Sequence, residues 1–415
     1  MPYPDGALDP ARVKEQAILT AVFERRGITR NELVERTGIQ QSTLNRAVAA
    51  LIDKDLLVTS DSGSSRTGRG RPSDLLRINP AAGYIVGLEF GREHLTLTAV
   101  DACGELVHTL EEAAPPPFTP EHASIDALLA AVDRFVEAAS ISAERLRALG
   151  VALHDVVTAE GQWLTQASDC APIDVRTYVE GRLGLPVVVD DVSRAFAEAE
   201  HRFGAGVGEP DMIYVFIGSH GVGGGVFVND ELLTSSKGIC GEIGHVVIDE
   251  DGRLCQCGSR GCLETVASRR AVEAGFDELL GRGVWSRLAP GATFADICRA
   301  AGEGDKGAYL VLNQLAQHMG RALAPGINLF GAPTIIIGGP VHLAGEAFVQ
   351  DLSAALRRRV VSGLVPHIKV RYAQLPSHAG AWGVAIRALE EAIRHGRFIA
   401  GEPQRRAGER IEARP

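Results

Sequence analysis

The sequence predicts a two-part α/β protein, in which a short helical head precedes a larger body of alternating strands and helices. Three observations support this organisation. Residues 11–54 carry apolar side chains at helical spacing, whereas residues 84–393 alternate between strand-like and helix-like apolar patterns. A cluster of cysteines near one histidine interrupts the body at residues 245–262. With 415 residues, 45% of them hydrophobic, the chain can form two or three domains with substantial cores.

The net charge of −10 is distributed unevenly along the chain. Residues 1–79 contain 12 Lys and Arg against 10 Asp and Glu, a net charge of +2, while the remainder contains 30 against 42, a net charge of −12. A slightly basic head on an acidic body is typical of a DNA-reading domain joined to a sensing domain. Because no apolar run reaches membrane-spanning length and no signal-peptide pattern follows Met1, we expect a cytoplasmic protein without membrane contacts.

The head is predicted to contain three helices. The first covers residues 11–26, where apolar residues recur at helical spacing. Thr29 and Glu32 form a capping-box pattern at the start of the second helix, which runs to Gly38. A short turn then leads to the third helix, at residues 41–54. Two helices joined by such a turn form a helix-turn-helix motif.

In that motif the N-terminal end of the second helix of the pair enters the major groove of DNA. The polar residues at this end are the predicted DNA contacts: Gln41, Ser42, Thr43, Asn45 and Arg46. Arg46 can donate two hydrogen bonds to one guanine. The alternative interpretation of this segment by itself is a small helical bundle with an ordinary solvated face.

A predicted β-hairpin follows the third helix, with strands at residues 56–58 and 75–78. The intervening Gly/Ser/Arg loop holds Arg69 and Arg71 in an Arg-Gly-Arg-Pro turn, which can insert into a narrow A·T-rich minor groove. This hairpin is the expected wing of a winged helix-turn-helix. We therefore predict a DNA-binding domain over residues 1–79, with a double-stranded DNA operator as its partner.

The body is predicted to cover residues 80–395, followed by a polar, disordered tail at residues 396–415. The strand-like segments are residues 84–91, 95–101, 105–110, 149–153, 186–189, 333–339 and 368–372, together with a Gly-rich hairpin at 213–226. The predicted helices are residues 122–139, 193–203, 310–323, 348–361 and 380–393. Strands that alternate with helices in two halves favour a layered α/β fold.

A predicted metal site lies within one short span of the body. Its four ligands are His245, Cys255, Cys257 and Cys262. Thiolates and an imidazole are the ligands that zinc prefers, and four protein ligands complete a tetrahedron, so we predict a structural zinc. The alternatives are free thiols beside a core histidine, or a disulfide, which the lack of a signal peptide disfavours.

Two carboxylates, Glu242 and Glu264, flank the metal loop in the sequence. A metal that holds this loop would orient both of them, together with His245, towards one ligand pocket. These three residues are therefore predicted to contact a ligand.

The stretch Gly-Glu-Ile-Gly-His at residues 241–245, followed by Cys-x-Cys-Gly-x-x-Gly-Cys-Leu-Glu at residues 255–264, resembles the signature of the ROK family (repressors, open reading frames, kinases). The resemblance extends over residues 80–395. It implies a two-lobed actin-like, ribonuclease H-like sugar-kinase fold after the winged head, because members are sugar kinases or transcription factors that kept the kinase fold. The family's regulators also carry a Gly-Arg-Pro wing, and their similarity implies a homodimer or homotetramer assembled through the body.

The resemblance also implies a sugar site. Asp191 matches the family's Asp that accepts a proton from a sugar hydroxyl, and Asp190 stands where the family has Asn. With Glu242, His245 and Glu264, these carboxylates would offer the dense set of acceptors that a monosaccharide needs. The alternative is that Asp190 and Asp191 only cap the helix that follows them.

The phosphate-binding motifs of the family's kinases are altered in this chain. Where the kinases have Asp-x-Gly-Gly-Thr, this sequence has Glu89-Phe90-Gly91-Arg92-Glu93, and the bulky Arg92 and Glu93 oppose close approach of a phosphate. Residues 218–220, Gly-Ser-His, replace the second loop's Gly-Thr-Gly. Both changes argue against ATP binding and against an enzyme.

The leading hypothesis is a transcriptional regulator of carbohydrate metabolism, in its simplest form a repressor, whose kinase-like domain binds a monosaccharide or sugar derivative. Binding would close the two lobes, reposition the heads and change operator affinity. Two alternatives remain open: an ATP-dependent sugar kinase with an added N-terminal domain, and a regulator with a vestigial sugar site that responds to a protein partner.

Overall fold

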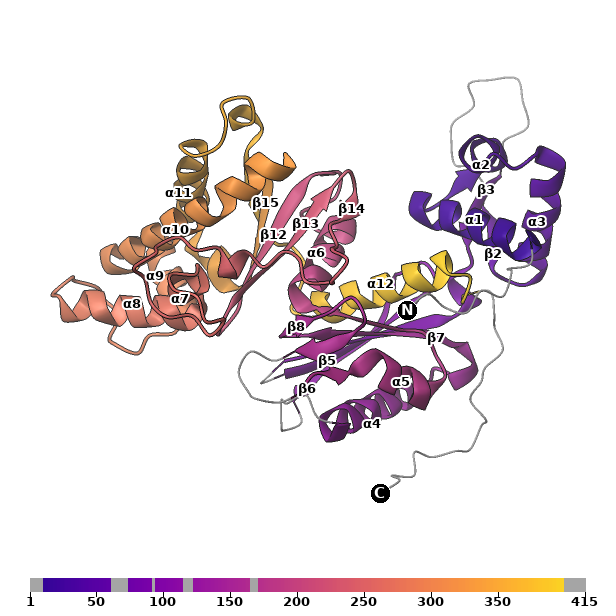
Figure 1. Cartoon of the computed structure of the whole chain (residues 1–415), viewed down its shortest axis with the longest axis horizontal. Helices are drawn as coiled ribbons and strands as arrows, with labels where there is room; N and C mark the ends of the chain where they lie inside the picture. Colours follow the sequence, from indigo (N-terminus) through magenta and orange to yellow (C-terminus); the bar gives the residue numbers. More distant parts are fainter. Residues whose placement is uncertain (1–9, 61–73, 92–93, 115–121, 165–170, 399–415) are drawn as a thin grey trace. The chain divides into compact units, whose positions relative to one another are not determined.

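The computed structural model describes residues 10–60, 74–91, 94–114, 122–164 and 171–398. The chain divides into two compact units (Figure 1). The first comprises Met1–Ala152, Asp174–Val189 and Val384–Pro415, and the second comprises Leu153–Ile173 and Asp190–Gly383. The predicted boundary near residue 80 falls inside the first unit, so the limits 1–79 and 80–395 remain predictions. Of the predicted disordered tail, residues 399–415 lie outside the described residues.

The head of the first unit has the three predicted helices and the predicted pair of strands. Its elements are α1 (Pro10–Arg25), β1 (Ile28–Thr29), α2 (Arg30–Thr37), α3 (Gln41–Asp53), β2 (Leu57–Ser60) and β3 (Leu75–Ile78). The sheet order is β1-β3-β2, and the short β1 was not expected from the sequence. The Thr29–Glu32 capping box forms as predicted, and Gly38 ends α2 in the left-handed conformation.

The body of the first unit is a five-stranded sheet with the order β11-β7-β4-β5-β6. The strands are β4 (Tyr84–Phe90), β5 (His94–Asp101), β6 (Leu106–Ala113), β7 (Leu146–Leu153) and β11 (Val187–Asp191). Figure 1 shows the helices α4 (His122–Ala138) and α5 (Val175–Leu183) on one face and α12 (Ala379–Arg394) on the other. The packing of α12 on β7 needs a glycine at Gly150, because a Cβ there would lie 2.3 Å from the Val384 carbonyl oxygen.

The second unit is built on another five-stranded sheet, with the order β14-β13-β12-β15-β16. Its strands are β12 (Met212–Ile217), β13 (Val222–Val228), β14 (Glu231–Leu232), β15 (Thr334–Gly338) and β16 (Lys369–Tyr372). The helices are α6 (Val192–Phe203), α7 (Glu264–Ala267), α8 (Arg269–Gly281), α9 (Phe294–Gly302), α10 (Lys306–Phe330) and α11 (Glu346–Arg357). A small sheet contains β8 (Val156–Val157), β9 (Gln162–Leu164) and β10 (Ile173–Asp174).

Short 3-10 helices complete both units: η1 (Pro80–Ala82), η2 (Ala143–Arg145), η3 (Ile243–His245), η4 (Pro340–Ala344) and η5 (Val365–His367). The two helix-covered sheets confirm the predicted duplicated α/β architecture.

The helix predicted at residues 310–323 is longer than expected, since α10 continues through Pro325. Its buried face extends to Ile327, and this tertiary burial outweighs the helix-breaking tendency of Pro325 and Gly326. Within the described ranges, no helix is both long and apolar enough to cross a membrane.

A buried histidine in the second unit makes stability depend on pH. His201 on α6 stacks against Phe227, with ring centroids 4.0 Å apart, and burial lowers its pKa although Glu198 and Asp230 partly offset the effect. A histidine with a lowered folded-state pKa stabilises the protein fully above its ordinary pKa of 6.5, and this contribution is lost as the pH falls below that value.

We therefore expect the free energy of unfolding to fall between about pH 7.5 and pH 5.5, and His201→Phe to reduce this slope. Urea titrations at several pH values would measure the slope. His367→Phe, which changes an exposed histidine, is the matched control. An unchanged slope in His201→Phe would show that other groups set the pH dependence.

Candidate metal and ligand site

The predicted metal ligands come together in the second unit. One ligand atom from each of His245, Cys255, Cys257 and Cys262 lies within 4.8 Å of the others. The Cys257 and Cys262 sulfurs are 3.7 Å apart, and the Cys255 sulfur is 3.6 Å from His245 Nδ1. Tetrahedral zinc with bonds of about 2.3 Å to sulfur requires sulfur atoms about 3.8 Å apart, so the cluster has the right size for such an ion.

The backbone of the loop holds the cysteines in these positions. The Cys255 amide donates to the Ser259 carbonyl at 2.8 Å, and isolated bridges join Leu254 to Arg260 and Val247 to Cys262. Gly261 has a φ of 68°, and a Cβ there would lie 1.5 Å from the Asp249 carbonyl oxygen. Only glycine satisfies both conditions, which explains why the cysteine motif includes it.

The three thiols differ in how readily they ionise. Burial raises the pKa of both Cys255 and Cys262. The backbone hydrogen bond from Ser259 is the largest of the causes that lower the pKa of the exposed Cys257 thiol to about 7. A bound cation would offset the cost of ionising the two buried thiols.

Glu242, His245 and Glu264 lie together, as the sequence predicted. His245 turns Nδ1 towards the cysteines, whereas its Nε2 lies 4.0 Å from a Glu242 oxygen. Glu264 lies 3.7 Å from His245 Nδ1, and the Cys255 thiol donates to it at 2.8 Å. The imidazole thus connects the metal cluster to Glu242, and Glu264 borders the cluster directly.

Several carboxylates share one electrostatic environment. Burial raises the pKa of Glu242 to about 7, and Asp191, Glu264 and Asp155 contribute in the same direction while Arg194 opposes it. The side chain of Asp155 also accepts a hydrogen bond from Trp163 Nε1 at 3.2 Å. A ligand rich in hydroxyl groups would find closely spaced acceptors here.

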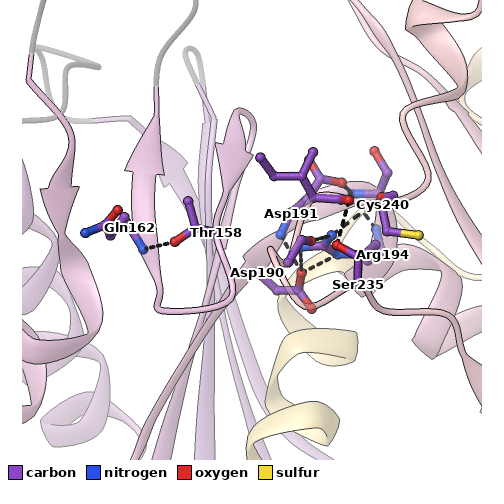
Figure 2. A network of polar contacts seen from close by, with 10 residues as sticks. Thr158, Gln162, Asp190, Asp191, Arg194, Ser235 and Cys240 are labelled. Carbon is purple, nitrogen blue, oxygen red and sulfur yellow. Dashed lines mark hydrogen bonds and ion pairs between the residues drawn. The ribbon is translucent and has the colours of Figure 1, made fainter. Parts of the chain in front are cut away.

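The two aspartates at the end of β11 have different roles (Figure 2). Asp191 caps α6 by accepting hydrogen bonds from the amides of Ser193 at 2.7 Å and Arg194 at 3.4 Å, as the capping alternative predicted for it. Asp190 does not cap the helix. It is only 2% exposed and accepts a hydrogen bond from Arg194 Nε at 2.5 Å. A ligand contact from Asp190 would therefore have to compete with Arg194.

Arg194 is the residue that sequence reasoning missed. It is 4% exposed and also donates to the carbonyls of Gly238 and Cys240, which lie in the loop that leads to Glu242 (Figure 2). Because Asp190 and Arg194 are four residues apart at the start of a predicted helix, the spacing was the one available signal. Arg194 neutralises Asp190 and holds the loop against α6.

The loop held by Arg194 also contacts the small sheet. The Ala159 amide, in the turn between β8 and β9, donates to the Lys237 carbonyl at 2.9 Å. A Cβ at Gly238 would lie 2.1 Å from the Ala159 nitrogen. The hairpin, which Figure 2 shows with Thr158 and Gln162, therefore packs against the loop.

The Gly-rich hairpin serves close packing around the site. A Cβ at Gly223 would lie 1.9 Å from Ser193 Oγ, and one at Gly221 would lie 3.1 Å from a Glu264 oxygen. The amides of Arg269 and Arg270 at the start of α8 donate to the carbonyls of residues 218 and 219. These amides are thus engaged within the protein and are not directed at a phosphate.

The predicted DNA contacts lie on the first turns of α3. Gln41, Ser42, Asn45 and Arg46 are exposed and Thr43 is half-buried. Leu44, Val48 and Leu51 are fully buried on the opposite side of the helix and hold it against the head's core. The predicted wing contacts Arg69 and Arg71, and Arg92 and Glu93 of the altered phosphate motif, lie outside the described residues.

Comparison with known proteins identifies both parts of the chain. Residues 85–391 match the ROK family, and residues 13–58 match a winged helix-turn-helix DNA-binding family. The xylose repressor of Caldicellulosiruptor bescii is 25% identical over 390 residues, which cover 92% of this chain and 96% of that protein.

Solved structures agree with these matches. A ROK family transcriptional regulator, a homologue of the Escherichia coli Mlc protein, has a TM-score of 0.80 and 26% identity, covering 94% of this chain and 99% of its own. A ROK family glucokinase from Streptomyces griseus, solved with glucose and AMPPNP, has a TM-score of 0.63 and 31% identity, covering 74% of this chain and 99% of its own. With its family match spanning most of the chain and following a winged helix-turn-helix, this protein belongs to the ROK family.

Proposed function

We propose that this protein is a DNA-binding transcriptional repressor of carbohydrate metabolism that responds to a monosaccharide or sugar derivative. The observation that carries the proposal is the joining, in one chain, of a winged helix-turn-helix at residues 13–58 to a ROK body at residues 85–391. The alignment with the xylose repressor includes both parts, which supports the same kind of activity here. Because its proposed target is operator DNA, we propose that it works in the cytoplasm.

The proposed metal is structural zinc, held by His245, Cys255, Cys257 and Cys262. The size of the cluster and its four soft or borderline ligands support this choice. When bound, zinc would join η3 to the cysteine loop and hold the His245 ring with Nε2 on the side of Glu242.

The proposed ligand is a monosaccharide or sugar derivative whose hydroxyl groups donate to Asp191, Glu242 and Glu264. Arg194 supports this arrangement because it neutralises Asp190 and holds the loop that leads to Glu242. With a pKa of about 7, Glu242 can accept or donate a hydrogen bond near neutral pH. Ligand binding would favour one of two states that differ in operator affinity.

On DNA, the first turns of α3 would enter the major groove, with Gln41, Asn45 and Arg46 directed at the bases. We propose that a homodimer or homotetramer presents two heads to a palindromic operator, since a helix-turn-helix protein recognises two half-sites by its symmetry. The predicted wing arginines, Arg69 and Arg71, would contact the neighbouring minor groove.

A second candidate function is an ATP-dependent sugar kinase. The glucokinase that is 31% identical over 74% of this chain favours it, together with Asp191 at the position of the family's proton acceptor. The replacement of both phosphate motifs and the added head oppose it. A coupled assay with ATP and a panel of hexoses would decide, with Asp191→Asn as the background control. Turnover above that background would establish the kinase.

The proposed function is tested by selecting operators from random DNA and measuring their binding by fluorescence anisotropy, with and without a panel of monosaccharides. We expect one sugar to weaken binding by roughly 5- to 150-fold, the range of typical allosteric couplings. Tight DNA binding that no sugar changes would point to the vestigial site and a protein partner. Failure to select any operator would overturn the proposal.

Arg46→Ala and Arg71→Ala test the two DNA contacts. Arg46→Ala should weaken operator binding by about 1–3 kcal/mol and relax the preference for one base, because a bidentate contact to guanine is lost. Arg71→Ala should also weaken binding while the melting temperature stays unchanged. Arg282→Ala, an exposed arginine on the second unit, is the matched control. Wild-type operator affinity in a variant would exclude that arginine from the interface.

A further inference from the structure

Residues 79–83, which we call the connector, join the head to β4, the first strand of the body. It contains η1 and lies between β3 and β4. Asn79 fastens it to the head, because the Asn79 amide donates to the Leu56 carbonyl at 3.0 Å and its side chain donates to the Asp55 carbonyl at 2.7 Å. The Asn79 side chain also accepts from the Ala81 amide at 3.0 Å.

Two arginines from a distant part of the sequence hold the connector from the body side. Arg145 donates to the Ala81 carbonyl, and its guanidinium lies 5.1 Å from the centre of the Tyr84 ring. Arg147, the second residue of β7, donates from both Nε and Nη2 to the Ala82 carbonyl, each at 3.2 Å. Two consecutive carbonyls of the connector therefore accept hydrogen bonds from charged donors, which are the stronger kind.

The turn after β5 adds two further contacts. The Ala102 amide donates to the Pro80 carbonyl at 3.4 Å, and the Cys103 thiol donates to the Ile78 carbonyl at 3.3 Å. The backbone carbonyls of residues 78, 80, 81 and 82 are thus all bonded to the body. Connectors between independent domains are typically exposed and make few contacts, so this degree of bonding is unusual for a passive linker.

The sequence of the connector is adapted to the arginines. A Cβ at Gly83 would lie 2.4 Å from Arg147 Cγ and 3.1 Å from the Arg145 carbonyl oxygen, so Gly83 allows the side chain to lie against the chain. Among the residues that the structure describes, neither arginine forms an ion pair with a carboxylate. Burial and the neighbouring Arg145 lower the pKa of Arg147. Two neighbouring guanidinium groups without a carboxylate partner repel each other, which costs folding free energy. Their hydrogen bonds to the connector carbonyls offset part of this cost.

The strand that carries Arg147 also leads to the ligand site. β7 runs from Leu146 to Leu153 and is buried throughout apart from Arg147 itself. Asp155, two residues beyond its end, is one of the carboxylates that raise the pKa of Glu242. A buried strand is a rigid element, so a displacement that reaches Leu153 through the backbone would be carried along β7 to Arg147.

We propose that Arg145 and Arg147 are positioning residues that clamp the connector to β7 and make the DNA-reading head follow the ligand state of the body. The claim that the head follows the ligand state rests on the proposed function as a sugar-responsive repressor. The clamp itself concerns only the coupling of the head to its sheet and is testable without any ligand.

The first test is hydrogen exchange of the full-length protein without ligand. In Arg145→Ala/Arg147→Ala, the amides of residues 81, 82 and 102 should exchange about tenfold faster or more, because several charge-assisted hydrogen bonds are lost. Amides within α3 and β12 should keep their wild-type rates, which shows that both units remain folded. The single variant Arg145→Ala should give a smaller acceleration, and Arg134→Ala, an exposed arginine of α4, should give none. Wild-type exchange in the connector of the double variant would overturn the clamp.

The second test measures operator affinity with and without the sugar that acts on the wild-type protein. The double variant should bind the operator within about threefold of the wild type, while the sugar-dependent change shrinks towards onefold. Arg145→Lys/Arg147→Lys, which retains the charges and part of the donors, should recover some of the response. A full sugar response in the alanine variant would overturn the coupling. A wild-type protein that responds to no sugar would instead overturn the proposed function, and the exchange rates would still decide the clamp.

Discussion

Arg194→Ala is expected to lower the free energy of unfolding by about 3–5 kcal/mol, the range seen when one partner of a buried ion pair is removed. Asp190 is 2% exposed, so without Arg194 its carboxylate would stay buried and lose the guanidinium that pairs with it. The loop at residues 235–241 would also lose the hydrogen bonds to the carbonyls of Gly238 and Cys240. We therefore expect weaker sugar binding as well, because this loop positions Glu242.

Urea unfolding of the full-length variant would measure this effect. The matched control is Arg299→Ala, which removes an exposed arginine paired with Asp296 and should cost less than about 1 kcal/mol. Replacing both partners, Asp190→Leu/Arg194→Met, should recover much of the stability but not the sugar binding, since apolar residues can replace a buried pair without stranding a charge. A cost for Arg194→Ala no larger than for Arg299→Ala would contradict the assigned role.

Cys257→Ser is expected to remove the metal and to lower the melting temperature by on the order of 10 °C, from a loss of several kcal/mol. Structural zinc contributes about 10–16 kcal/mol of apparent binding energy in small zinc-finger peptides, and part of that should remain visible in this larger unit. Cys257 is exposed, so the substitution leaves no cavity and its effect reports on ligation. Sugar binding should weaken too, since His245 belongs to the cluster and Glu264 borders it.

Metal content by mass spectrometry and melting curves with and without a chelator would measure these effects. The wild-type protein should hold one zinc per chain, and a chelator should bring its melting temperature close to that of the variant. Cys103→Ser, which exchanges the same atoms outside the cluster, should retain the metal. A Cys257→Ser protein that melts like the wild type would exclude a structural metal.

Features that depend on neighbours in the sequence could be predicted well. The three helices of the head follow from apolar periodicity, and the Thr29–Glu32 capping box forms within one turn. The metal cluster also follows from local spacing, because its cysteines lie on one short loop that Gly261 allows to turn. Asp191 as a helix cap is similarly local, since it accepts hydrogen bonds from the amides of Ser193 and Arg194, two and three residues further along the chain.

Other elements could not be assigned in this way. The helices α5, α8 and α9 were not among the predicted elements, and α10 continues through Pro325, beyond the predicted end of that helix at residue 323. Local propensity is a small energy per residue, so the burial of a helix face in the finished core can outweigh it.

By itself, the sequence determined the winged helical head, the α/β body, the cysteine cluster and the carboxylates near it, since each rests on a periodicity or a short spacing. Only the tertiary structure decided that Asp190 is neutralised by Arg194, that Arg194 holds the loop before Glu242, and that Arg145 and Arg147 hold the connector. The contacts of Arg194 with its loop and of the two arginines with the connector join residues 44–65 positions apart, whereas Asp190 and Arg194 are only four positions apart. Such pairs form when the sheets bring distant strand ends together, and a guanidinium can bond any exposed carbonyl, so nothing local in the sequence specifies its partner.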